Sequence, residues 1–456
     1  MIKGNDLGKD SILRLVINLA IPAMIAQLVN VLYSIIDRMY IGHIPEIGNI
    51  ALAGIGVCGP IVTLLSSFGT LVGIGGSILV AMSMGEGDNK KAEDILANSF
   101  LLLIIFSGVL TIVFLILKEK LIIWFGASDV TFQYANTYLT IYTAGTFFAL
   151  MALGLNYFIN CQGFAFAGMC TVVIGAISNI ILDAVFIFGF NLGVAGAAYA
   201  TVIAQMISFI FAIAFMYNRK VKIKIKFRNY SLGIIKKILS IGMSPFIILA
   251  TDSFIIIAMN SVLQRYGGPE QGDFLVSCVT IVQSYFLLIT GPLIGISGGT
   301  QALISYNYGA GDSKRVKKSE RFILLIALIF TTSMFLISQF LPQVFIRLFT
   351  DVPDYIEFCT WGIKVFTLGV IPMAFQYVFV DGLTALGRVK TALTLSLTRK
   401  GLYVVSTLML PIIYSATSAF YAQPIADITS ATITTVVFLL IFNKHLQKRV
   451  EKIQNT

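Results

Sequence analysis

Two aspartates of this chain stand inside long apolar segments, where an ionised carboxylate is costly. Asp37 lies in the segment 12–40 and Asp183 in the segment 165–188. Acidic residues in apolar segments of membrane-spanning length are rare, and they usually mark an ion or substrate pathway. Each aspartate lies a few residues before the glycine at which its segment ends. In helices that run in the same direction, both carboxylates would lie roughly 10 Å below the same edge.

Three further polar residues fall at a comparable depth. Asn179 stands four residues before Asp183 and therefore on the same helix face, and Thr201 and Tyr138 lie near the same edge of two other segments. Such a group could bind a monovalent cation through oxygen ligands. It could also hold a proton, because two close carboxylates cannot both ionise cheaply. A polar cluster that only ties helices together is the alternative. We expect a cation-coupling site formed by Asp37, Asn179, Asp183 and Thr201.

The second half of the chain carries a different set of polar residues. Asp252 and Gln283 could form a polar spot in a cleft between the halves. Asp381 lies near the inner end of its segment, one to two helical turns before Arg388, and we expect these two to pair at the membrane surface. The role of Asp427 stays open.

Composition places these residues in a membrane. The 456 residues are 57% hydrophobic and 12% charged, whereas a soluble domain is about 25% charged. The apolar residues form long blocks, which is typical of transmembrane helices. We therefore predict an all-α integral membrane protein with twelve transmembrane helices, at residues 12–40, 52–82, 92–117, 131–157, 165–188, 193–217, 234–262, 274–304, 321–343, 355–383, 390–413 and 418–443.

The basic residues predict the orientation. With a cytoplasmic N-terminus, most of the 32 Lys and Arg residues fall on the inner side, including those of 219–237 and 314–321 and the four from Arg388 to Lys400. We therefore expect a multi-pass protein of the inner (plasma) membrane with both termini in the cytoplasm. The net charge of +10 then comes from basic residues in loops that face anionic membrane lipid. Because these loops explain the charge, we expect no nucleic-acid partner. The scattered cysteines and two histidines form no metal-ligand pattern, so we expect neither a metal, nor a cofactor, nor an enzyme.

The two halves of the chain resemble each other at a spacing of about 223 residues. GEGDNKK (85–91) matches GAGDSKR (309–315), AAYATVIA (197–204) matches AFYAQPIA (419–426), and Pro22 matches Pro245. Six spans per half give a parallel repeat, which suits two lobes that rock around a central site. We expect an N-lobe at 1–217, a basic cytoplasmic linker at 218–233 and a C-lobe at 234–456. The same spacing places Asp37 on Asn260 and Asp183 near Ser406, so the acidic pair belongs to the first half alone.

The two GxGD strings allow a second interpretation. Intramembrane aspartyl proteases carry GxGD, but their aspartate lies within a helix and faces a second one. Here each string precedes a Lys-rich loop. We therefore expect a glycine that stops one helix and an aspartate that caps the next.

These residues together resemble the multidrug and toxic compound extrusion (MATE) family, and most closely its bacterial MepA-like branch. The resemblance covers essentially the whole chain. It rests on Pro22, Asp37, Asn179 and Asp183, and on GEGDNKKAED, PLIGISGGTQALISYNYGAGD (292–312) and LSLTRKGL (395–402). The resemblance implies an antiporter that expels organic cations or lipophilic drugs in exchange for H⁺ or Na⁺, with two six-helix lobes in a V. We expect a monomer.

The resemblance also implies roles for single residues. Tyr33 and Tyr138 would lie near the coupling site, and the first span would bend at Pro22 when that site is protonated. Another branch of the family has an acid in span 10, earlier than Asp381, where this chain reads PMAFQYVF. A second coupling site in span 10 is therefore not expected. Asp252 would match an acid that the other branch carries in span 7.

Two alternatives remain within the wider superfamily. A lipid-linked oligosaccharide flippase would usually have fourteen spans and a cationic cavity, whereas here the acids within the spans predominate. An exporter of a physiological metabolite would have the same fold. The sequence favours neither H⁺ nor Na⁺ strongly, although we expect protons.

Overall fold

The computed structural model describes residues 4–454, apart from the side chains of residues 49, 253, 254, 256, 257, 269, 270, 273, 452 and 453. Within that range the first half forms α1 (Ile12–Gly42), α2 (Gly48–Gly85), α3 (Asn89–Trp124), α4 (Asp129–Ala144), α5 (Thr146–Cys161), α6 (Ala165–Asp183), the π-helical turn η1 (Ala184–Gly189) and α7 (Gly193–Met216). The second half forms α8 (Leu232–Gly309), α9 (Ser313–Phe340), α10 (Pro342–Ile346), α11 (Pro353–Phe366), α12 (Val370–Ala385), α13 (Val389–Ile413), η2 (Ala416–Tyr421) and α14 (Ala422–Gln454).

The helices account for all twelve predicted spans. Among the described residues, nine helical stretches are long and apolar enough to cross a membrane, and two of these lie within α8 on either side of Gly268, where the backbone breaks. The pairs α4–α5 and α11–α12 each make one more span, bent by 56° and 47°. The remaining predicted span, 390–413, is α13, which carries Arg399 and Lys400. The prediction of an all-helical membrane protein is confirmed.

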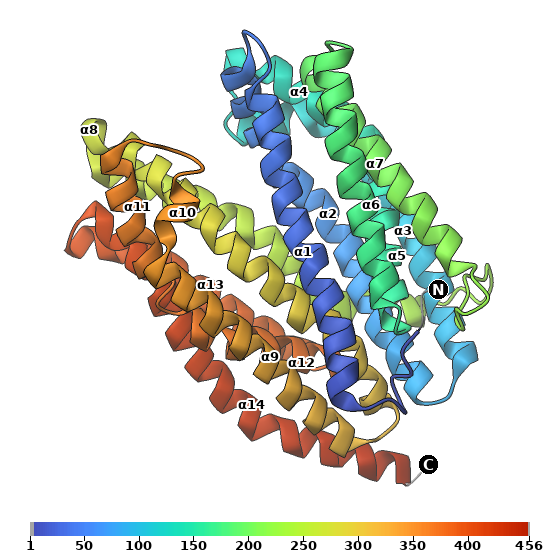
Figure 1. The fold of residues 1–456 in the computed structure, drawn as a ribbon. Helices are drawn as coiled ribbons and strands as arrows, with labels where there is room; N and C mark the ends of the chain where they lie inside the picture. Colours follow the sequence, from blue (N-terminus) through green and yellow to red (C-terminus); the bar gives the residue numbers. More distant parts are fainter. Residues whose placement is uncertain (1–3, 455–456) are drawn as a thin grey trace.

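The two halves lie side by side and diverge at the end away from both termini, which gives the molecule a V shape (Figure 1). Each half has its own apolar core. Helix α1 contributes to both cores: Leu15 and Leu19, near its start, lie in the core of the second half, whereas Ile41, near its end, lies in the core of the first. Because Pro22 lies between these two regions, α1 connects the halves through a residue that removes a helical hydrogen bond.

The basic connector between the halves is packed against the first half. In the run VKIKIKF, Val221, Ile223 and Ile225 are buried in the core of the first half, while Lys222 is exposed. The backbone N–H of Ile223 donates to Gln162 Oε1 at 2.9 Å. The alternation that the sequence shows therefore arises from an extended segment with one face on the protein.

The internal repeat is visible in how the helices end. Asp88 and Asp312 each accept a hydrogen bond, at 2.9 Å, from the backbone N–H three residues later. The glycines before them, Gly87 and Gly311, have φ of 80° and 74°, which a side chain would strain. The prediction that the GxGD strings stop one helix and cap the next is confirmed.

The same strings bring α2 and α8 into contact at the end where the halves converge. A Cβ atom on Gly85 would clash with the carbonyl oxygen of Tyr306 and stand 2.9 Å from the backbone nitrogen of Ala310. A Cβ atom on Gly309 would clash in turn with the backbone of Met82. Only glycine at both positions lets the two helix ends pack backbone to backbone.

Replacing Gly85 with valine should therefore separate α2 from α8 at this end. Overpacking of this kind costs roughly 1–3 kcal/mol, and we expect the unfolding temperature of the purified protein to fall by several degrees. Gly56→Val in the same helix is the matched control, since a Cβ atom there has no neighbour within 4 Å. Equal unfolding temperatures for the two variants would contradict this packing.

An ion-pair network joins the halves beside these glycines. Glu86 pairs with Lys91 at 2.8 Å and with Arg449, from the opposite half, at 2.7 Å. Partial burial acts to raise the pKa of Glu86, but the hydrogen bonds from Lys91 and Arg449 outweigh it and lower that pKa. Glu86 is therefore charged at neutral pH, and the network weakens only as the pH falls through the lowered pKa.

Candidate functional site

The structure brings Asp37 of α1 and Asp183 of α6 within hydrogen-bonding reach of each other. Asp183 is fully buried, and Asp37 is half-buried. One oxygen of each carboxyl group, Oδ1, has no hydrogen-bond partner among the described residues. Two facing carboxyl groups with unused oxygens can take up a proton or a cation.

Asn179 and Thr201 complete this group. With its amide nitrogen toward the carboxyl group, Asn179 donates to Asp183 Oδ2 at 2.8 Å and accepts from the backbone N–H of Thr201 at 3.3 Å. Both residues are buried. The hydroxyl groups of Tyr33 and Tyr138 reach Thr201 and face Asp37. The four residues expected to form the site and the two tyrosines expected near it therefore lie together.

The turn after Asp183 is irregular. The α-helix α6 continues into the π-helical turn η1, so the helical turn is wider directly after Asp183. Single π turns inside helices are often found at functional sites. Here η1 packs against α7, which carries Thr201.

A cavity of about 710 Å³ separates the halves. Asn179 and Thr201 lie in its wall on the first half, and Asp252 and Asp381 lie in its wall on the second. The lining residues come from α1, α2, α5, α6, α7, α8, α12 and α13. The carboxyl group of Asp183 lies behind this wall, next to Asn179, which connects it to the cavity.

Two basic residues that the sequence analysis counted as cytoplasmic also line the cavity. Arg399 and Lys400 lie about three turns inside α13. Arg399 Nε pairs with Asp427 at 2.7 Å, and Lys400 Nζ pairs with Asp252 at 2.7 Å. Counting Arg399 and Lys400 with the inner loops was wrong, because both residues lie within the helix α13. Their position inside an apolar span was the available signal, since a charge there requires a partner.

These pairs define the surroundings of two aspartates that the sequence left open. Asp252 pairs with Lys400, and Gln283 lies beside Tyr403. Asp427 is fully buried and also accepts from Gln423 at 2.8 Å. The polar spot predicted for the second half exists around Asp252, but its partner is a lysine.

The expected pairing of Asp381 with Arg388 is wrong. Arg388 Nε donates to His445 at 3.0 Å, whereas Asp381 points toward Ser297 and Gln301 of α8. Asp381 lies about one turn before the end of α12, which the sequence placed at the membrane surface, but neighbouring helices cover it there. Its carboxyl group therefore belongs to the cavity.

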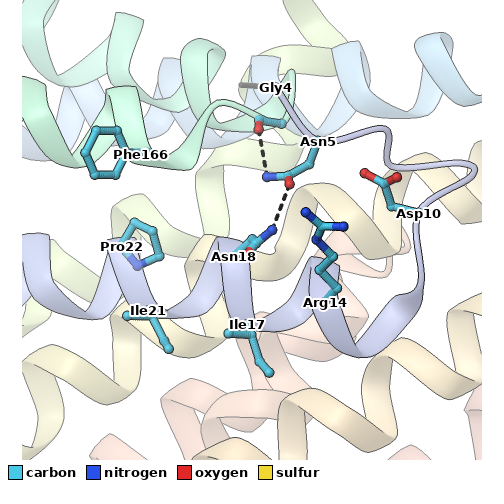
Figure 2. A pocket seen from close by; sticks show the side chains of 10 residues that line it. Gly4, Asn5, Asp10, Arg14, Ile17, Asn18, Ile21, Pro22 and Phe166 are labelled. Atoms are coloured by element: carbon cyan, nitrogen blue, oxygen red, sulfur yellow. Dashed lines mark hydrogen bonds between the residues drawn. The ribbon is translucent and has the colours of Figure 1, made fainter. Parts of the chain in front are cut away.

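Pro22 lies at the edge of a second, smaller cavity of about 320 Å³ near the N-terminus (Figure 2). There Asn5 bridges two elements: it donates to the carbonyl of Gly163 at 3.2 Å and accepts from Asn18 at 3.0 Å. Because Pro22 has no N–H group, the carbonyl of Asn18 lacks its usual helical donor. The helix α1 nonetheless continues through Pro22 in this structure.

Comparison with known proteins agrees with this fold. The multidrug export protein MepA of Staphylococcus haemolyticus (strain JCSC1435) is 23% identical over 438 residues, covering 96% of this chain and 95% of MepA. An outward-facing multidrug resistance MATE family transporter of the MOP superfamily has a TM-score of 0.88 at 22% identity, covering 100% and 99% of the two chains. A MOP superfamily transporter from Pyrococcus furiosus, described by the reverse polarity of its binding pocket, has a TM-score of 0.90 at 21% identity, covering 97% and 98%.

The sequence model of the MatE family matches the chain twice, at residues 22–185 and 245–409. The second match begins at Pro245, the counterpart of Pro22 in the repeat. The two matches together include most of the chain and parts of both walls of the central cavity. The chain therefore belongs to the MatE family.

Proposed function

We propose that this protein exports organic cations and other lipophilic drugs in exchange for protons, by alternating access to the central cavity. The observation that carries the proposal is the pair of facing carboxyl groups of Asp37 and Asp183, each with an unpartnered oxygen. Such a pair changes its charge when a single proton enters or leaves. MepA is named a multidrug export protein, which agrees with the direction of transport.

In the proposed cycle, α1 links the site to the cavity. Protonation of the pair removes the repulsion between α1 and α6, and α1 then bends at Pro22, where its hydrogen bonding is already interrupted. The bend moves Tyr33 and the neighbouring cavity wall, which expels the bound drug. Release of the proton on the other side of the membrane straightens α1 again. Na⁺ could occupy the same oxygens, so the driving ion has to be measured.

The cavity wall suits flat, cationic substrates. Tyr33, Tyr157 and Tyr377 line it together with small and apolar residues. Tyrosine faces attract organic cations by cation–π interaction, most strongly where water is excluded. We place the protein in the inner (plasma) membrane with both termini on the cytoplasmic side. The V then opens to the outside of the cell. We expect a monomer in contact with lipid.

A second candidate function is export of an anionic or zwitterionic metabolite. Arg399 and Lys400 in the cavity wall favour it, since both could bind a carboxylate or phosphate group. Each of these bases is neutralised by its own aspartate, however, which leaves little positive charge for a substrate. The proposal of an organic-cation exporter therefore stands first.

Transport by the purified protein in lipid vesicles tests the proposal. A pH gradient and a Na⁺ gradient are imposed separately, and the movement of ethidium is followed by fluorescence. We expect the pH gradient alone to drive ethidium transport, and vesicles without protein give the background. Transport driven only by Na⁺ would contradict proton coupling. If neither gradient moves ethidium or tetraphenylphosphonium, the proposed substrate class is wrong.

A further inference from the structure

The smaller cavity beside Pro22 is separate from the site described above. Among the described residues none lines both cavities: Pro22 lines the smaller one, and the next residue, Ala23, lines the central one. The volume of about 320 Å³ lies at the lower end of the range of small-molecule pockets. The cavity can therefore hold a ligand of its own, next to the proline at which α1 is proposed to bend.

The N-terminal segment forms a fixed wall of this cavity. The backbone N–H and the side-chain amide of Asn5 both donate to the carbonyl of Gly163, each at 3.2 Å. A Cβ atom on Gly163, whose φ is 86°, would stand 2.5 Å from the carbonyl oxygen of Asn5. Only glycine at this position lets the segment lie against the turn between α5 and α6.

The same segment is attached to the second half of the molecule. Leu7 is buried in the core of that half. Arg315 of α9 donates to the carbonyl oxygens of Leu7 and Asp10, each at 3.0 Å. A ligand in the cavity would therefore contact the segment that joins the two halves at the end where they converge.

Two charged side chains of opposite sign lie at one end of the cavity. Arg14 and Asp10 line it beside Asn5 (Figure 2). Among the described residues the guanidinium group of Arg14 has no hydrogen bond or ion pair. Asp10 has no basic side chain as a partner there either, and its Oδ2 accepts from the backbone N–H of Asp6 at 2.9 Å. A guanidinium group suits a phosphate, and a carboxylate suits an ammonium group, so this end matches a ligand that carries both.

The other end of the cavity is apolar and open to the outside of the molecule. Ile17, Ile21 and Phe166 line it and are between 38% and 52% exposed. Arg14, Ile17 and Ile21 share one face of α1, because they are three and four residues apart. With the N-terminus in the cytoplasm, as proposed above, Ile21 lies about 10 Å deeper in the membrane than Arg14. The cavity thus changes from polar to apolar with depth, as a phospholipid of the cytoplasmic leaflet does.

We propose that this cavity binds one phosphatidylethanolamine molecule of the cytoplasmic leaflet. The lipid phosphate pairs with Arg14, and the primary ammonium group donates to the carboxylate of Asp10. One acyl chain lies along Ile17, Ile21 and Phe166. Phosphatidylcholine has no N–H to donate to Asp10, and phosphatidylglycerol has no positive charge there, so the cavity selects against both. The choice of leaflet rests on the orientation in the proposed function, whereas binding itself requires neither a drug nor an ion gradient.

Lipid binding to the purified, delipidated protein in detergent tests the proposal. Native mass spectrometry measures the fraction of the protein that carries one lipid as each of the three lipids is added with the same acyl chains. We expect phosphatidylethanolamine to bind about tenfold more tightly than the other two, which is the effect of one hydrogen bond between charged groups. Arg14→Gln should weaken the binding of all three lipids by about tenfold or more, since all three carry the phosphate. Asp10→Asn should remove the preference for phosphatidylethanolamine.

Two control variants have exposed charges outside the cavity. Lys9→Gln changes the residue next to Asp10, and Asp354→Asn removes a carboxylate of the second half. Both should bind the three lipids like the wild type. Ile17→Ser should weaken the intact lipid several-fold and leave its headgroup preference unchanged, whereas Ile177→Ser, at an exposed position of α6 outside the cavity, should have no effect.

The possible outcomes distinguish the source of the ligand. Soluble glycerophosphoethanolamine should not displace the lipid at equal concentration, and displacement would show that the cavity takes a free headgroup instead. If Arg14→Gln binds phosphatidylethanolamine like the wild type, the lipid does not occupy this cavity. If phosphatidylglycerol binds as tightly as phosphatidylethanolamine, the match to Asp10 is wrong. None of these results depends on ethidium transport, so this proposal and the proposed drug export fail separately.

Discussion

Asp183→Asn is expected to slow strongly the transport of ethidium driven by a pH gradient. Asparagine has the shape of aspartate and can keep the hydrogen bond with Asn179, but it cannot change its charge. The paired carboxyl groups of Asp37 and Asp183 would thus be replaced by one carboxyl group beside a neutral amide. Coupling between two sites is typically worth about 1–3 kcal/mol, so we expect a roughly 5- to 150-fold loss of driven transport.

Binding measured without a gradient separates coupling from folding in this variant. We expect Asp183→Asn to bind ethidium in detergent with an affinity close to that of the wild type, because its carboxyl group lies behind the cavity wall. Asp129→Asn, an exposed aspartate of the same half, should transport like the wild type. Unchanged gradient-driven transport by Asp183→Asn would show that the pair only holds helices together.

Arg399→Met should be the most destabilising single substitution among those considered. It removes the guanidinium group that pairs with Asp427 at 2.7 Å, and Asp427 is fully buried. Gln423 would be left as the donor to a buried charge. Breaking a buried ion pair by removing one partner typically costs about 3–5 kcal/mol. We expect a loss of this size in the free energy of unfolding, measured by denaturant titration in detergent.

The double variant Arg399→Met, Asp427→Asn should recover much of the lost stability, since it removes the stranded charge as well. Lys91→Met is the control: Lys91 pairs with Glu86 at the surface with half of its side chain exposed, so its loss should cost less than about 1 kcal/mol. If the double variant is no more stable than Arg399→Met, the ion pair does not account for the effect.

Most of the fold could be predicted from the sequence because a membrane restricts the choices. Long apolar blocks can cross it only as helices, and the repeat of GEGD and GAGD indicated two halves of equal topology. The site at Asp183 could be predicted for a related reason. Depth in a helix follows from counting residues, so residues at one depth on neighbouring helices become candidates for contact.

The cavity wall of the second half could not be predicted in the same way. Glu320 lies one residue before the predicted span 321–343, and Asp381 was placed at the membrane surface near the inner end of its span. The burial of Glu320 and the place of Asp381 in the cavity wall depend on how α8, α9 and α12 pack, which no periodicity encodes. Lys400 and Asp252 are 148 residues apart, and only the folded chain shows that they meet.

The connector between the halves leaves almost no slack. Lys226 pairs with Glu93 at 2.5 Å, Asn98 Nδ2 donates to the carbonyl of Asn229 at 3.0 Å, and the backbone N–H of Ser231 donates to Asn98 Oδ1 at 2.9 Å. The chain is therefore anchored to the first half up to the residue before α8.

The start of α8 continues this attachment, because Ile238 lies in the core of the first half and Gly242 packs against the backbone of Leu71. In the proposed rocking movement, no loose tether absorbs the displacement, and the hinge has to lie beyond the first turns of α8. In the proposed cycle, this attached junction limits how far the two halves can rotate relative to each other, and about which axis.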